Sequence, residues 1–127
     1  MNLRSDLGRV RGLGSAKSGS HHWMHQRLSA IALIPLALWF VTSLMSHMGD
    51  SHGELVDWIS SPFVTVLLLA LVTSAFYHAK LGLQVVIEDY VHAEMSKMAL
   101  LVAMKLAVAF GALLGVVAIL KISFGMA

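Results

Sequence analysis

The chain has 127 residues, of which 57% are hydrophobic and only 13% are charged, with a formal net charge of +2 and no cysteine. Soluble domains carry about 25% charged residues, so this balance argues against a water-soluble enzyme with one compact core. The lack of cysteine excludes disulfides and thiolate metal sites. The composition therefore predicts a membrane protein.

A basic segment, residues 1–27, opens the chain. Its cations are Arg4, Arg9, Arg11, Lys17 and Arg27, and its first 20 residues are also rich in Gly and Ser. This composition is typical of a flexible or surface-lying segment. The apolar run that follows is longer than the core of a signal peptide and shows no small-residue cleavage pattern, so we expect it to be retained as a helix.

Three apolar blocks fill residues 28–127. We expect helices at about 28–48, 62–90 and 97–121, because each block approaches or exceeds the roughly 18 to 20 residues that cross a bilayer. A membrane β-barrel would need many more segments of alternating polarity. The sequence thus predicts an all-α membrane protein with three transmembrane helices. Three helices form only a fraction of a bundle, so we expect a partner to contribute further helices.

The connection between the first two blocks is acidic. It contains Asp50, Glu54 and Asp57 but no Lys or Arg, in contrast to the segment that precedes the first helix. Cytoplasmic flanks of membrane helices carry an excess of Lys and Arg. We therefore expect the N-terminus in the cytoplasm and, after three crossings, the C-terminus on the outer, periplasmic side.

A histidine lies deep inside the second block. His78 precedes Asp89 by eleven residues, which places its ring about 16 Å from the cytoplasmic end and near the middle of the bilayer. Gly82, one turn further on, leaves a flat space beside the ring where a macrocycle could lie, and neutral imidazole is a common axial ligand of haem iron. A neutral histidine hydrogen-bonded to another helix is the alternative, because His-xxx-Gly alone is a weak motif.

A six-coordinate haem needs a second axial ligand. The other histidines, His21, His22, His25, His47, His52 and His92, fall near the ends of the expected helices rather than at the depth of His78. If His78 binds haem, the opposite ligand is therefore expected from another subunit.

Asp89 and Tyr90 close the second block. Asp89 projects from about the same face as His78, and Tyr90 is rotated about 100° further, at the membrane boundary. A phenol donates a hydrogen bond to a carbonyl oxygen and a carboxylate relays protons, a combination that suits a quinone. The alternatives are a tyrosine of the interfacial belt and, with Glu88, a solvated helix end.

Two lysines interrupt the apolar blocks. Lys80 is about 200° around the helix from His78 and so points away from the proposed haem. Lys105 is likewise a charged side chain deep inside an apolar block, the third. We expect both to contact polar groups on neighbouring helices or on a partner subunit.

The spacing of His78, Gly82, Asp89 and Tyr90 on a transmembrane helix resembles the hydrophobic membrane anchor subunit of succinate dehydrogenase. The segment "GSHHWMHQRLSAIAL" before and into the first helix is also similar, with a histidine and an arginine six residues apart. The resemblance implies a non-catalytic subunit of a quinone-reducing enzyme complex in the bacterial inner membrane. Its three helices would form half of a heterodimeric anchor bundle with a second three-helix cytochrome b anchor subunit, docking the iron–sulfur and flavoprotein subunits, with no nucleic-acid partner.

The resemblance also implies roles for individual residues. Haem b would lie between the two anchor subunits with His78 as one axial ligand and the partner chain giving the other. Arg27 and His21 match positions near the haem propionates, with His22 a competing choice for His21. Tyr90 would hydrogen-bond ubiquinone, and Asp89 matches the acidic residue that neighbours this tyrosine in the ubiquinone site of the family.

Two other classes of protein remain open. One is a small homo-oligomeric transporter in which His78, Lys80 and Lys105 form a proton or ion path. The other is a structural membrane protein without haem, in which His78 packs helices and Tyr90 anchors the interface.

Overall fold

The computed structural model describes residues 5–10 and 17–126, and within them the chain is helical with no strand. The helices are α1 (Asp6–Val10), α2 (Lys17–Ser46), α3 (His52–Ser60), α4 (Pro62–Tyr90) and α5 (Glu94–Ser123). Three of them, α2 from Gly19 to Ser46, α4 and α5, are long and apolar enough to cross a membrane. The predicted all-α architecture with three spans is confirmed. Parts of the basic segment, residues 1–4 and 11–16, lie outside the described residues.

The first long helix begins earlier than the sequence suggests. α2 starts at Lys17, eleven residues before the apolar block, so the histidine-rich stretch is helical and continuous with the first span. Residues 21–27 contain no proline or glycine, and Met, Gln and Arg are good helix formers, so nothing locally ends the helix there. His21, His22 and His25 therefore have fixed helical positions.

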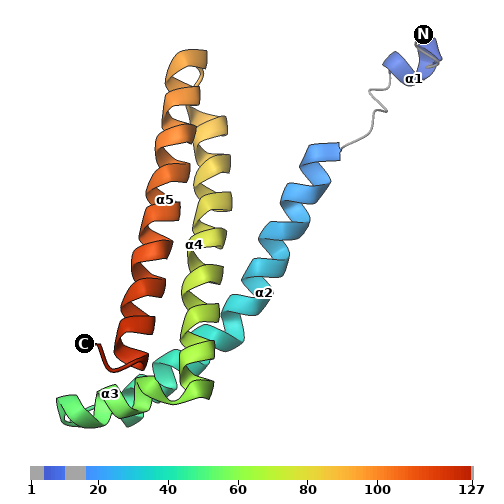
Figure 1. Ribbon diagram of the computed structural model, residues 1–127. Coiled ribbons are helices and arrows are strands. Elements are labelled where there is room, and N and C mark those ends of the chain that lie inside the picture. The colour runs from blue at the N-terminus through green and yellow to red at the C-terminus, as the bar shows by residue number, and fades with distance from the viewer. Residues whose placement is uncertain (1–4, 11–16, 127) are drawn as a thin grey trace.

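Helices α4 and α5 run side by side in opposite directions (Figure 1). Two glycines of α5 make this close packing possible. A Cβ at Gly111 would lie 2.7 Å from Phe76 Cε1, and one at Gly115 would lie 2.8 Å from Val72 Cγ1. Small residues four apart let membrane helices approach closely, as the GxxxG pattern predicts.

The three spans enclose very little interior. The buried apolar side chains among the described residues are Val64, Leu68 and Leu81, all on α4. In the most apolar stretch of each span, 17% of the residues of α4 and 6% of those of α2 and α5 are buried. Most of the apolar surface is therefore left for lipid or for helices of another chain.

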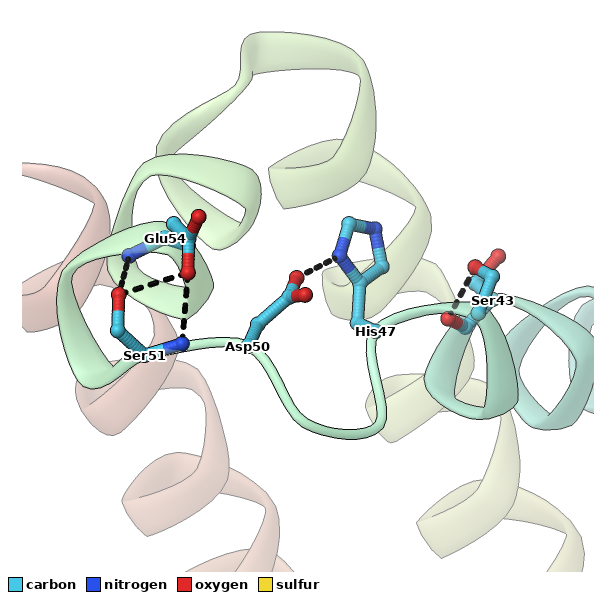
Figure 2. Close-up of polar contacts among 6 residues, drawn as sticks. Ser43, His47, Asp50, Ser51 and Glu54 are labelled. Atoms are coloured by element: carbon cyan, nitrogen blue, oxygen red, sulfur yellow. Dashed lines mark hydrogen bonds and ion pairs between the residues drawn. The ribbon is translucent and has the colours of Figure 1, made fainter.

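A tight turn joins α2 to α3 (Figure 2). Gly49 adopts φ 101°, a left-handed conformation that other residues rarely adopt. His47 Nδ1 and Asp50 Oδ2 lie 2.6 Å apart across the turn. The centroid of the Trp58 ring lies 4.5 Å from that of His47 and 6.3 Å from that of Trp39, so Trp58 packs α3 back against the end of α2.

Helix α3 starts with a capping box (Figure 2). The Ser51 N–H and Oγ–H both donate to Glu54 Oε2, at 2.7 and 2.8 Å, and the Glu54 N–H donates back to Ser51 Oγ. The backbone bond, then the side-chain bond, lower the pKa of Glu54, and the charge of Asp50 opposes them. Because the pKa of Glu54 is lower in the folded state, its ionised carboxylate stabilises the fold. This stabilisation is complete above the ordinary pKa of glutamate and is lost as the pH falls through the lowered pKa.

Replacing Ser51 with alanine should loosen the first turn of α3. An N-cap serine is worth about 1 kcal/mol, so hydrogen–deuterium exchange of the Glu54 amide should become about fivefold faster. The pKa of Glu54 should rise toward its ordinary value, because one donor to the carboxylate is lost. Ser46→Ala is the matched control, since Ser46 Oγ–H donates to Ser43 O within α2. Equal exchange in the two variants would contradict the capping role.

Candidate functional site

Helices α2 and α4 are joined at mid-span by two side-chain hydrogen bonds. His78 Nδ1 lies 2.9 Å from Ser29 Oγ, and the neighbouring Tyr77 hydroxyl is hydrogen-bonded to His25 Nδ1. His25 and Ser29 are four residues apart on α2, so they share one face of that helix. Ser29 is 7% exposed, which makes it one of the few buried polar side chains among the described residues. The pairing fixes where the His78 ring lies.

The hydrogen-bond partners of Ser29 determine which nitrogen of His78 carries the proton. Ser29 Oγ–H donates to the Gln26 carbonyl oxygen at 2.9 Å, so the one hydroxyl hydrogen is already used. When the Ser29 hydroxyl donates to Gln26, Ser29 Oγ accepts from His78 and Nδ1 is the protonated nitrogen. Nε2 is left with a free lone pair, which is the tautomer that a metal ligand needs.

One face of α4 beside His78 is open. A Cβ at Gly82 would meet nothing within 4 Å. Ala75, Ala79 and Val86 are exposed on the same side, whereas the buried Leu81 faces α2. Phe76, which packs on α5, is rotated about 160° from His78 around the helix. The face that contains His78 and Gly82 is thus free for a flat group or another chain.

A groove of about 450 Å³ lies between α2 and α4, on the side of their contact opposite to the open face at Gly82. It is lined by His25, Leu28, Ser29, Ala32, Thr73, Ser74 and Tyr77, and Gly82 is not among the lining residues. The two hydrogen-bonded pairs therefore separate this groove from the open face.

Asp89 and Tyr90 lie at the far end of α4. Tyr90 is 79% exposed, and neither side chain makes a hydrogen bond to another described residue. The neighbouring Glu88 accepts from Gln84 Nε2 at 3.0 Å, so Asp89 is the carboxylate that is free to act. Twelve residues of helix separate His78 from Tyr90, which corresponds to about 18 Å. The chain thus presents two places for chemistry, one at mid-span and one at the helix end.

The basic side chains of α2 lie apart from His78. The Arg27 guanidinium carbon lies 5.2 Å from the centroid of the Trp23 ring, and Arg27 is exposed. Arg27 is two residues before Ser29, about 200° around the helix, so it points away from α4. His21 is exposed with its ring 6.0 Å from that of His25. The structure therefore brings Ser29 to His78 but places neither Arg27 nor His21 beside it.

His21 and His22 both line a groove with Lys80, Leu81 and Gln84 of α4, and His22 is the less exposed of the two. It lines a polar groove with Gly19, Gln84 and Glu88, and its Nε2 atom is buried without a partner among the described residues. The geometry favours His22 as the histidine that is held in the α2–α4 seam.

No three His, Asp or Glu side chains in the described part of the chain gather closely enough to hold a metal ion. His78 is therefore a single donor, suited to a metal whose other ligands belong to a cofactor or to another subunit. Sequence inspection missed Ser29, because a serine in an apolar helix is common and its partner lies 49 residues away. The sequence offered one indication of this contact: His25 and Ser29 are four residues apart and so share the helix face that meets α4.

Together, the fold and the site define a class of protein: a small three-span membrane protein with a histidine near the middle of its central helix and most of its apolar surface left for lipid or for helices of another chain. The family model for the transmembrane subunit of succinate dehydrogenase and fumarate reductase matches residues 1–118. The chain belongs to this family, as the sequence resemblance predicts.

Individual relatives agree with the family. The succinate dehydrogenase hydrophobic membrane anchor subunit of Rickettsia bellii is 36% identical over 105 residues, which cover 83% of this chain and 84% of the relative. The protein of the same name from Rickettsia conorii is 36% identical over 91 residues, covering 71% and 72%. The succinate dehydrogenase membrane anchor subunit of Reclinomonas americana is 33% identical over 84 residues, covering 64% and 70%.

Proposed function

We propose that this membrane anchor subunit helps to bind haem b and ubiquinone in a succinate:quinone oxidoreductase of a bacterial inner membrane. The observation that carries the haem assignment is the hydrogen bond from His78 Nδ1 to Ser29, whose own proton is committed to the Gln26 carbonyl. A metal-bound histidine characteristically donates its other N–H in this way. His78 combines this tautomer with a position near the middle of α4.

The surroundings of His78 fit a haem. Nε2 would be one axial ligand, Gly82 would leave room for the macrocycle, and the second axial ligand would come from a second three-helix cytochrome b anchor subunit. Haem b would supply one-electron redox chemistry there. The protein side of the site holds the ring orientation, through Ser29, and excludes water by its depth.

Arg27 and His21 are proposed to act near the haem propionates. Arg27 makes no hydrogen bond to another described residue, so its guanidinium donors are free for a carboxylate. Because Arg27 points away from α4, it would meet a propionate only where the cofactor or the partner extends around α2. His21, or His22 on the face turned toward α4, would supply a second donor at the cytoplasmic end.

Tyr90 and Asp89 are proposed to form this chain's part of the quinone site. The Tyr90 O–H would donate a hydrogen bond to a quinone carbonyl oxygen, and the Asp89 carboxylate would pass a proton from water to that oxygen as the quinone is reduced. Their exposure at the end of α4 gives both groups access to water and to a docked subunit. The electrons would come from clusters in an iron–sulfur partner rather than from this chain.

The proposed orientation has the N-terminus in the cytoplasm and the C-terminus in the periplasm. The acidic α2–α3 turn and α3 would then lie on the periplasmic side, and the α4–α5 turn with Tyr90 would face the cytoplasm. The iron–sulfur and flavoprotein subunits would dock on that cytoplasmic face, and succinate itself would not touch this chain.

Purification through a tag on this chain, in mild detergent, tests the proposal as a whole. We expect flavin-containing and iron–sulfur subunits and a second small membrane subunit to co-purify, with a b-type haem signal in the reduced-minus-oxidised spectrum. A colourless homo-oligomer would overturn the proposal and favour a transporter or a structural membrane protein.

Replacing Ser29 with alanine should alter the haem without removing it. His78 Nδ1–H would lose its acceptor, the imidazole would become a weaker donor to the iron, and the haem midpoint potential should rise. A hydrogen bond is worth about 1 kcal/mol, which corresponds to about 40 mV for a one-electron couple. Ser29→Thr keeps the hydroxyl and should restore the potential. A potential that does not change in Ser29→Ala would contradict the assignment of His78.

Tyr90→Phe should slow ubiquinone reduction about tenfold, because a single hydrogen bond worth about 1.4 kcal/mol is lost. Succinate oxidation with a soluble artificial acceptor should stay unchanged, since that reaction bypasses the quinone. Thr42→Val is the control, as it removes a hydroxyl that donates only within α2, to carbonyl oxygens such as that of Leu38. Equal loss of both activities in Tyr90→Phe would indicate failed assembly rather than a quinone contact.

A further inference from the structure

Two lysines at the same depth line one groove between α4 and α5. The groove has a volume of about 220 Å³ and is lined by Thr73, Phe76, Tyr77, Lys80, Lys105, Val108, Ala109 and Ala112. Lys80 lies nine residues before Asp89, and Lys105 lies eleven residues after Glu94, so both lie about 14 to 16 Å from the α4–α5 turn. This depth is near the middle of a hydrocarbon layer of about 30 Å.

The chain itself compensates these two charges poorly. Lys80 is half-buried with Nζ 5.1 Å from the centroid of the Tyr77 ring, a cation–π contact within its own helix. Lys105 is exposed. Neither lysine forms an ion pair with another described residue, although an ammonium at this depth is costly unless it is paired.

No acidic residue of this chain reaches the groove. The sequence has no Asp or Glu between Asp57 and Glu88 and none after Glu94, so a second copy of the chain offers no carboxylate at this depth either. The proposed haem surface lies elsewhere, because Lys80 is rotated about 200° from His78 around α4. The counter-charge must therefore come from a different molecule.

We propose that this groove docks a transmembrane helix of a partner subunit, and that a mid-membrane Asp or Glu of that helix pairs with Lys80 and Lys105. The walls of the groove suit a helix, because Ala109, Ala112 and Thr73 are small and allow close backbone approach. Two ammonium groups on facing helices offer six N–H donors to a single carboxylate. This inference rests on the proposed function for the identity of the partner, which is the second anchor subunit.

Coupling with an apolar carbodiimide tests the pairing in the assembled complex. The reagent enters the membrane, activates a carboxylic acid, and leaves as a urea when a neighbouring lysine amine attacks to form an amide. We expect a covalent product that contains this chain and the second anchor subunit. Peptide mass spectrometry should join Lys80 or Lys105 to an Asp or Glu in a transmembrane helix of the partner.

Matched variants assign the product to the groove. Lys80→Met with Lys105→Met should abolish it and lower the yield of assembled complex several-fold. Lys121→Met, which removes an exposed lysine near the end of α5, should change neither. The inference is overturned if the wild-type complex gives no such product, or if the two lysines couple to a haem propionate or to an acidic lipid.

The outcomes for the two proposals are distinguishable. Loss of the partner subunits and of the haem signal from the wild-type preparation would refute the proposed function. A complete, haem-containing wild-type complex without the coupled product would refute only the lysine–carboxylate pairing.

Discussion

The hydrogen bond between Ser29 and His78 is the contact on which the geometry of the membrane helices depends. In hydrocarbon no water is available to satisfy a buried imidazole N–H, so this bond and the adjacent His25–Tyr77 pair hold α2 against α4 at a defined register. The bond also fixes the ring orientation and the tautomer of His78. The same contact thus supports both the packing and the candidate ligand.

Helix α4 is central because two of its faces meet different helices of this chain and a third is open. One face meets α2 through Leu81 and the hydrogen-bonded pairs, and a second meets the glycines of α5. The third contains Gly82 and is open, because a Cβ at Gly82 would meet nothing within 4 Å, and His78 lies at its edge with its ring hydrogen-bonded to Ser29 of α2. A subunit built in this way is complete only in an assembly, which agrees with its small buried core.

The sequence predicted what depends on helical period and membrane depth. The three spans, the mid-span position of His78 and the open side at Gly82 all follow from 3.6 residues per turn and a layer of known thickness. It did not predict contacts between helices, because Ser29 and His78 are distant in sequence and serines are common in apolar helices. It also missed α3, a nine-residue helix whose capping box and Trp58 contacts depend on how the turn folds. The cation–π contact of Lys80 with Tyr77, within α4, was also not predicted.

Depth also explains how the two proposed kinds of chemistry, haem binding and quinone reduction, could share one helix. Reduction of a quinone consumes protons, so its site needs water, and Asp89 and Tyr90 are exposed at the end of α4. The proposed haem would only exchange electrons and would need no proton path, and a low-dielectric position at mid-span would keep competing water away from His78. About 18 Å of helix keeps the two environments apart. An anchor of this size can therefore contribute to an electron-holding site and to a proton-consuming site without a cavity that connects them.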